Sequence, residues 1–176
     1  MVPDDEALVA RARGGDDDAF RLIFERHHRG VYRFIYALTG DHARTEDVVQ
    51  DTFVAAYRGM AAFRGGASLR TWLCAVARNT MAKSFRRGSP PAVMPAAEPT
   101  PEAALLGREL DGAIARALRQ LDEEKRVVFT LKTMEGLSYD QIAAITGSSI
   151  AKLKTDLFRA KAHMRKLLAH FQEGRE

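Results

Sequence analysis

The chain has 176 residues, 46% of them hydrophobic, and a formal net charge of +4, which allows one or two small folded domains and favours acidic partners only weakly. Its single cysteine, Cys74, excludes an internal disulfide and a cysteine-rich zinc site, and it is compatible with a reducing cytoplasm. The acidic N-terminus MVPDDEALVA lacks the positive charge of a signal peptide and no apolar run is long enough to span a bilayer, so we expect a cytoplasmic protein without direct membrane insertion.

Apolar residues recur at helical spacing in three segments of the first half of the chain. The first helix would begin after a capping Asp17 or Asp18 and end at Gly40, because glycine suits the left-handed backbone that terminates helices. A second helix would run from about Thr45 to Met60, and a third would start near Ser68. The buried stripe of the second helix would contain Val49, Phe53, Ala56, Tyr57 and Met60.

Polar residues of the second predicted helix form an acidic face. Asp47, Gln50 and Asp51 are spaced i, i+3 and i+4, so they share one side of the helix, away from its buried stripe. Such a face is ordinarily just solvated, and no histidine joins it to suggest a metal site. A Glu-x-x-His spacing at Glu25 and His28 lacks the second copy that di-iron bundles need. We therefore expect no metal, no other cofactor and no catalytic set.

A basic segment between residues 58 and 87 has seven bases and no acid. In FRGGASLRTWLCAVARNTMAKSFRR a glycine-rich loop leads into the third helix, and flexible backbone beside basic and aromatic side chains can receive a base turned out of a separated duplex. Trp72 is better explained as a core residue, and Cys74 as a small, partly buried side chain rather than a redox sensor. The basic and polar residues outside the apolar stripe of this helix are Arg70, Asn79, Lys83, Arg86 and Arg87.

Five of the six prolines lie in GSPPAVMPAAEPTPEAALLG, between Gly88 and Gly107. Proline lacks an amide donor and disfavours helix before it, so this composition is typical of an extended, flexible linker. It divides the chain into a domain of residues 1–87 and a domain of residues 108–176. No strand pattern stands out, and the predicted fold class is all-α: two small helical domains joined by the proline-rich linker of residues 88–107.

The second domain contains a helix-turn-helix pattern in GLSYDQIAAITGSSIAKLK. Ser138 and Gln141 fit a capping box, Gly147 fits the end of that helix, and Ser148 or Ser149 can cap the next one. Six bases and one acid follow between residues 152 and 166, as phosphate contacts require. An ordinary helical hairpin with a solvated face is the alternative. The buried stripe would be Ile150, Leu153, Leu157, Ala160, Met164 and Leu167, with Ala151, Lys152, Thr155 and Arg159 opposite.

Taken in order, these segments resemble the extracytoplasmic-function (ECF) group of bacterial sigma factors over nearly all of residues 19–168. In the first domain the likeness rests on GDDDAFRLIFERHHRGVYRFIYALTGD, EDVVQDTF and SLRTWLCAVARN followed by two arginines. In the second it rests on LDEEKRVVFTLKTMEGLSYDQIAAITGSSIAKLKTDLFRAKAHMRKLL. The resemblance implies a transcription initiation factor, not an enzyme, that binds core RNA polymerase and promoter DNA. It also implies control by an anti-sigma factor, which is often membrane-anchored and would then hold the chain at the inner membrane face.

The resemblance further implies three sets of site residues. The acidic face matches the surface that grips polymerase, through Glu46, Asp47, Gln50 and Asp51. The glycine-rich loop and the helix after it match the reader of the minus-ten promoter element, through Arg64, Ser68, Arg70, Asn79, Lys83, Arg86 and Arg87. The second helix of the helix-turn-helix and its cap match the reader of the minus-thirty-five element, through Ser149, Lys152, Lys154, Thr155, Arg159 and Lys161.

Two positions depart from the family pattern. Lys83 stands where an acid is common, and Asp156 stands where the recognition helix usually has an arginine. We expect Asp156 to pair with Lys152 or Arg159 rather than to read a base, because an unpaired carboxylate near phosphate would be repelled. The alternative function is a stand-alone helix-turn-helix transcriptional regulator, which would leave the acidic face and the basic loop and helix of the first domain unused.

Overall fold

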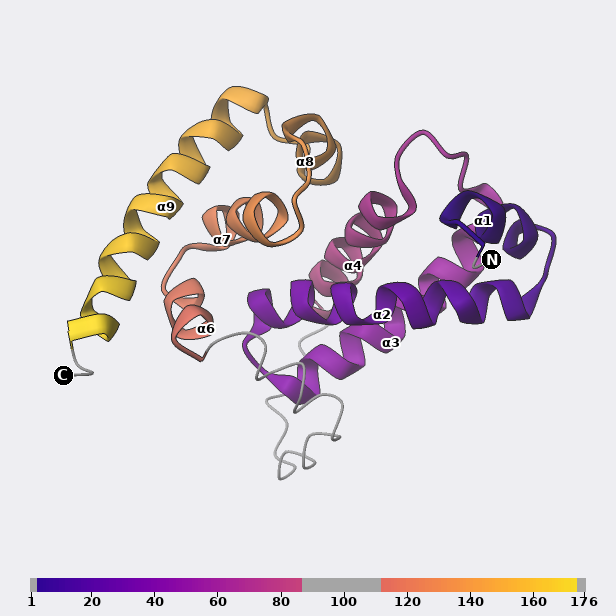
Figure 1. Cartoon of the computed structure of the whole chain (residues 1–176), viewed down its shortest axis with the longest axis horizontal. Coiled ribbons are helices and arrows are strands. Elements are labelled where there is room, and N and C mark those ends of the chain that lie inside the picture. Colours follow the sequence, from indigo (N-terminus) through magenta and orange to yellow (C-terminus); the bar gives the residue numbers. More distant parts are fainter. Residues whose placement is uncertain (1–2, 87–111, 174–176) are drawn as a thin grey trace.

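The structure, a computed structural model, describes residues 3–86 and 112–173, and its regular elements in these ranges are all helical (Figure 1). The first half contains α1 Asp5–Arg13, α2 Asp17–Thr39, α3 His42–Gly59 and α4 Leu69–Arg86, with a 3-10 turn η1 at Met60–Ala62. The second half contains α6 Gly112–Arg119, α7 Glu123–Phe129, α8 Tyr139–Thr146 and α9 Ile150–Glu173, with a π-helical turn η2 at Thr130–Met134. The predicted all-α fold class is confirmed. The predicted linker lies outside the described residues.

Aspartate side chains cap the starts of α2 and α3, and the backbone of a glycine ends α2. Asp16 caps α2 by accepting a hydrogen bond of 3.0 Å from a backbone amide of the first turn, so neither of the two predicted aspartates is the cap. Gly40 ends α2 with a φ of 66°, as predicted. Asp41 then caps α3 in the same way at 2.9 Å, and this helix begins at His42, earlier than predicted.

Helices α8 and α9 meet at the turn of residues 147–149. Ser138 and Gln141 form the predicted capping box: the Ser138 hydroxyl accepts from the Gln141 amide at 3.2 Å, and the Gln141 side chain accepts from the Ser138 amide at 2.8 Å. Gly147 ends α8 with a φ of 73°. Of the two serines considered as caps for α9, Ser149 makes the bond, accepting from the Lys152 amide at 3.3 Å. The helix-turn-helix predicted from the sequence is present.

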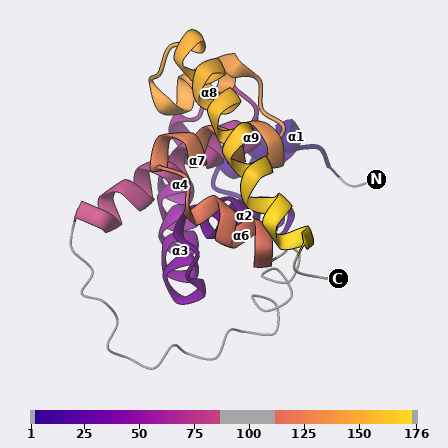
Figure 2. The same ribbon diagram turned by 90° about the vertical axis from the view of Figure 1, so that its left-hand side faces the viewer.

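The two halves pack against each other, a contact not expected from the sequence. One hydrophobic core joins residues of both halves, among them Phe34 of α2, Leu73 of α4, Leu131 of η2 and Ile142 of α8. A second cluster buries Ala37 of α2 against α6 and α9. Helix α8 lies on α4, and α6 lies at the C-terminal end of α2. Figure 2 views the molecule from the side of the second half. Within the described ranges, no helix has both the length and the apolar character needed to cross a membrane.

Two side chains expected in buried stripes are exposed instead. Tyr57 of α3 is 52% exposed, with its ring edge against Phe20 and its hydroxyl donating to Asp17 Oδ1 at 2.7 Å. Ile150 is 37% exposed because it stands in the first turn of α9, before the buried Leu153. Periodicity gives the direction of a side chain but not how far the neighbouring helices extend over it, and both predictions were therefore wrong.

Candidate nucleic-acid interface

Helix α9 presents a basic face to solvent because its apolar stripe packs inward. Leu153, Leu157, Ala160 and Met164 are buried on the side of α6 and α7. The opposite side is exposed from the first turn onward. The residues predicted to contact the minus-thirty-five element are all in exposed positions of this helix or its cap: Ser149, Lys152, Lys154, Thr155, Arg159 and Lys161.

Two carboxylates hold the ammonium group of Lys152. Its Nζ lies 2.7 Å from Glu124 Oε2 of α7 and 2.7 Å from Asp156 Oδ2, one turn further along α9. Hydrogen bonds to Asp156 and Glu124 raise the pKa of Lys152. The predicted pairing of Asp156 with Lys152 is confirmed, and the Asp156 side chain is only 12% exposed. Lys152 is therefore paired within the protein, which makes it less available to a DNA phosphate.

An aromatic side chain that the sequence analysis missed lies on the same outer face. Phe158 is 75% exposed, although phenylalanine is usually buried. It lies near Thr155, whose hydroxyl donates to Ala151 O at 3.1 Å. Lys154 extends along the first helix of the pair, with Nζ 5.7 Å from the Tyr139 ring centroid. The signal for Phe158 was available, since helical spacing places a large apolar residue opposite the buried stripe.

The glycine-rich loop leads into α4 as the sequence predicts. Arg64 is exposed, Gly65 has a φ of 76°, and the Ser68 hydroxyl accepts from the Thr71 amide at 3.2 Å in the first turn of α4. Asn79 and Lys83 are exposed further along α4. The remaining predicted contacts are not described in full: the structure describes the backbone but not the side chain of Arg86, and Arg87 lies outside the described residues.

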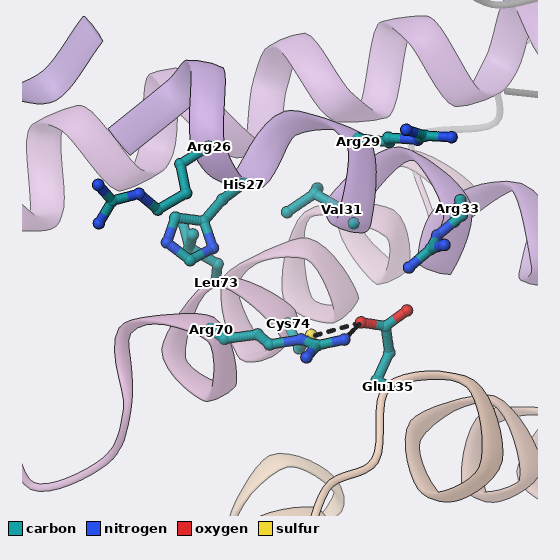
Figure 3. Close-up of a pocket in the computed structure, with 10 residues that line it drawn as sticks. Arg26, His27, Arg29, Val31, Arg33, Arg70, Leu73, Cys74 and Glu135 are labelled. Atoms are coloured by element: carbon teal, nitrogen blue, oxygen red, sulfur yellow. Dashed lines mark hydrogen bonds and ion pairs between the residues drawn. The ribbon is translucent and has the colours of Figure 1, made fainter. Parts of the chain in front are cut away.

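Arg70, also predicted to contact DNA, forms an ion pair with the second half of the chain (Figure 3). Its Nη2 and Nε lie 2.5 and 3.1 Å from Oε2 of Glu135, which follows η2. The pair borders a cavity of about 500 Å³ between the halves, which Arg29 and Arg33 of α2 also line. Figure 3 shows the Arg33 side chain directed from α2 toward the Glu135 carboxylate. The site is strongly positive, with Glu135 as its one lining carboxylate.

The acidic face predicted on α3 is largely exposed. Asp47, Gln50 and Asp51 are exposed, and Glu46 is half-buried. Beside them, α2 and α3 form a largely apolar hollow of about 510 Å³, which the sequence analysis did not anticipate. Its apolar lining consists of Phe20, Phe24, Phe53, Val54 and Tyr57. The face therefore combines exposed negative charge with apolar surface, as protein-binding surfaces do.

The residues considered for metal binding and redox chemistry have structural partners. Glu25 pairs with Arg21 at 3.0 Å, and the His28 ring packs against Phe24 and Phe53. In the described part of the chain, no three His, Cys, Asp or Glu side chains are grouped so as to hold a metal ion. Cys74 is 2% exposed, more deeply buried than predicted, and burial raises the pKa of its thiol to about 12. The half-buried Trp72 packs against Phe63, with ring centroids 4.9 Å apart.

Family comparisons match both halves of the chain. Residues 23–90 match Sigma-70 region 2, and residues 111–164 match Sigma-70, region 4. The ECF RNA polymerase sigma-E factor of Salmonella typhimurium is 34% identical over 176 residues, an alignment that covers 89% of this chain and 90% of that protein.

Two solved structures share the arrangement of helices. CnrH, in complex with the cytosolic domain of CnrY, superposes with a TM-score of 0.72 at 28% identity, over 94% of this chain and 97% of that one. The sigma factor RpoE of Bartonella quintana, in complex with the anti-sigma factor NepR, superposes with a TM-score of 0.68 at 25% identity, over 85% and 96% of the two chains. With both regions present in order and a full-length relative at this identity, the chain belongs to the ECF sigma factors of RNA polymerase.

Proposed function

We propose that this ECF sigma factor binds core RNA polymerase, directs it to a set of promoters, and is controlled by an anti-sigma partner. The observation that carries the proposal is the presence, in one chain, of an exposed acidic face on α3 and an exposed basic face on α9. The acidic face suits a basic protein surface, and the basic face suits DNA phosphate. A stand-alone regulator would use only the basic face on α9.

The first half, residues 1–87, would bind polymerase and read the minus-ten element. Asp47, Gln50 and Asp51 would make the polymerase contact, with Glu46 beside them and the apolar hollow adding buried area. Arg64 and Ser68 of the loop, and the polar face of α4, would hold the separated strand. An exposed glycine loop that leads into a basic helix supports this assignment, because unpaired bases need both backbone access and phosphate contacts.

The second half, residues 108–176, would place α9 in the major groove of the minus-thirty-five element. Arg159 and Thr155 have the chemistry to bond to base edges, and Phe158 can contact a thymine methyl group. Lys154 and Lys161 would bind phosphates at the flanks. Lys152, held between Glu124 and Asp156, would fix the start of the helix rather than read a base.

Control by a protein partner follows by analogy. The RpoE structure contains the anti-sigma factor NepR, and the CnrH structure contains the cytosolic domain of CnrY. We expect a comparable partner for this chain and an action in the cytoplasm, where polymerase and promoter DNA are found.

Run-off transcription with purified core polymerase on genomic promoter fragments tests the proposal. The expected result is a set of defined transcripts that require this protein and that weaken when Arg159 is replaced by alanine. Core polymerase without the protein is the control. Tight, sequence-specific binding to duplex DNA by the protein alone, with no effect on transcription by core polymerase, would favour the stand-alone regulator instead.

A further inference from the structure

The cavity that Glu135 borders contains two buried polar atoms without partners. Oε1 of Glu135 is buried and has no hydrogen-bond partner in the described structure, while Oε2 accepts from Arg70 at 2.5 Å. Nε of Arg33 is likewise buried and unbonded within the described residues. Both residues line the cavity of about 500 Å³, and Figure 3 shows the Arg33 side chain directed toward the Glu135 carboxylate. The cavity therefore presents one unused acceptor and one unused donor.

The lining of this cavity has a surplus of positive charge. One glutamate lines it together with four arginines, which are Arg26, Arg29, Arg33 and Arg70. Asp5, which lies outside the lining, offsets the charge of Arg26 at a distance of 2.7 Å. Even with Arg26 left out of the count, the arginines outnumber the glutamate. An anion is therefore the kind of ligand that this lining favours.

Gly30 keeps the space beside the Glu135 carboxylate open. It lies within α2 and lines the cavity, although glycine is unfavourable in the interior of a helix. A Cβ atom at this position would lie 4.0 Å from Oε2 of Glu135, so a longer side chain would project beside the carboxylate. The lack of a side chain at Gly30 therefore preserves room for a ligand.

The unused donor and the unused acceptor together define the ligand. Arginine binds oxyanions through charge-assisted hydrogen bonds, so Nε of Arg33 suits an oxygen of phosphate or sulfate. Oε1 of Glu135 needs a donor, and it would repel an oxyanion that has no proton left. At neutral pH inorganic phosphate retains at least one O–H group, whereas sulfate retains none. A phosphate monoester has mostly lost its last acidic proton, because its second pKa is about 6.

We propose that this cavity binds inorganic phosphate, with one phosphate oxygen accepting from Arg33 and one phosphate hydroxyl donating to Oε1 of Glu135. Arg70 holds the same carboxylate through Oε2 and so orients Oε1. Arg26 and Arg29 do not point toward the carboxylate in Figure 3, and they would add positive potential rather than direct contacts. The site does not depend on the proposed function, because a DNA phosphodiester has no acidic proton to donate.

Isothermal titration calorimetry of the full chain in phosphate-free buffer, at about pH 7.5, tests the proposal. We expect saturable binding of inorganic phosphate with a dissociation constant of about 1 mM or tighter. Sulfate and methyl phosphate, compared at the same ionic strength, should bind at least about tenfold more weakly, since neither supplies the donor that Glu135 requires. At about pH 5 methyl phosphate regains its proton and should approach the affinity of inorganic phosphate.

Three variants assign the binding to named residues. Arg33→Met should weaken phosphate binding by about tenfold or more, whereas Arg21→Met, at an exposed arginine of the same helix outside the cavity, should not change it. Gly30→Leu should abolish binding by filling the cavity, without removing any charge. Glu135→Gln places an amide donor beside the ligand, so sulfate should then bind about as well as phosphate.

Circular dichroism checks that each variant remains folded. If Glu135→Gln does not fold, Arg33→Met and Gly30→Leu still test the site. Equal affinities of the wild-type chain for phosphate and sulfate, or no saturable phosphate binding, would overturn the proposal. Wild-type affinity in both Arg33→Met and Gly30→Leu, or a folded Glu135→Gln chain that still prefers phosphate to sulfate, would overturn it as well.

Discussion

Removal of the Arg126 guanidinium should destabilise the whole packed unit, because this one group bonds to backbone in both halves. Nη1 donates to Leu38 O of α2 at 2.7 Å. Within the second half, Nε donates to Leu118 O at 2.9 Å, and Nη2 donates to Leu121 O at 2.8 Å and Arg119 O at 3.2 Å. Burial removes part of the water around the guanidinium charge, and this loss of solvation lowers the pKa of Arg126. The hydrogen bonds to the four carbonyl oxygens offset this loss of solvation.

The expected loss can be worked out from these four bonds. Three of them involve partly buried atoms, while the bond to Arg119 O is longer and exposed, so water can replace it. At about 1 kcal/mol for each partly buried bond, Arg126→Met should lower the free energy of unfolding by ~3 kcal/mol. Methionine preserves much of the apolar stem, which limits the loss from packing. Arg126→Lys should recover only part of the difference, since one ammonium cannot span carbonyl groups on two helices.

Urea denaturation followed by circular dichroism measures these differences. Arg165→Met, at an exposed arginine of α9 outside this set of bonds, is the matched control and should change the midpoint little. A loss below about 1 kcal/mol for Arg126→Met would show that the four bonds do little beyond what water provides, and the reasoning would fail. If Arg126→Lys had the same free energy of unfolding as the wild-type chain, the ability of the guanidinium to reach carbonyl groups on two helices would not matter for stability.

Three further predictions concern the surfaces and the thiol. Replacing both Asp47 and Asp51 with alanine should weaken binding to core polymerase by about tenfold or more while circular dichroism stays unchanged, and unaltered affinity would remove these residues from the interface. In transcription from a randomised minus-thirty-five library, Asp156→Ala should change overall affinity without changing the preferred bases, whereas Arg159→Ala should cost about 1–3 kcal/mol at one position if it reads a guanine. A new base preference for Asp156→Ala would contradict its assignment as a partner of Lys152. Because burial raises the pKa of Cys74 to about 12 from 9.0, iodoacetamide should modify it slowly in the folded chain and rapidly in urea. Its contribution to stability should be complete below pH 9 and be lost as the pH rises toward 12, and equal alkylation rates in the two states would contradict the burial.

The features that could be predicted from the sequence are those set by nearby residues. The Ser138–Gln141 capping box and the glycine ends at Gly40 and Gly147 depend on spacings of a few residues, and all three are present. Asp156 and Lys152, which form an ion pair, are likewise only one helical turn apart. Such signals identify helices, their ends and the face that each presents, which is why the helix-turn-helix could be located in advance.

The contact between the halves could not be predicted in this way. Arg70 and Glu135 are 65 positions apart, and Arg126 reaches Leu38 across 88. Glutamate is rarely buried, so nothing in its local sequence marks Glu135 as an interior residue. The exposure of Tyr57 and the burial of Cys74 have the same origin, because each depends on which helix covers the position. The local sequence pattern predicts which residues lie on each face of a helix. Tertiary packing determines which neighbouring helix covers that face.

Arg70 and Lys152, both expected to bind DNA, are paired with carboxylates of the chain itself. Glu135 accepts from Arg70, and Glu124 and Asp156 accept from Lys152. A cation that is already paired with a carboxylate neutralises a DNA phosphate less fully. It therefore releases fewer counterions from the DNA and adds less to DNA affinity than an unpaired cation. The structure therefore pairs one cation of each proposed DNA surface with a carboxylate of the chain itself. The Arg70 pair joins the two halves, whereas Glu124, Lys152 and Asp156 all lie within the second half. The Arg70 pair therefore requires the packing of the halves, and the Lys152 set does not.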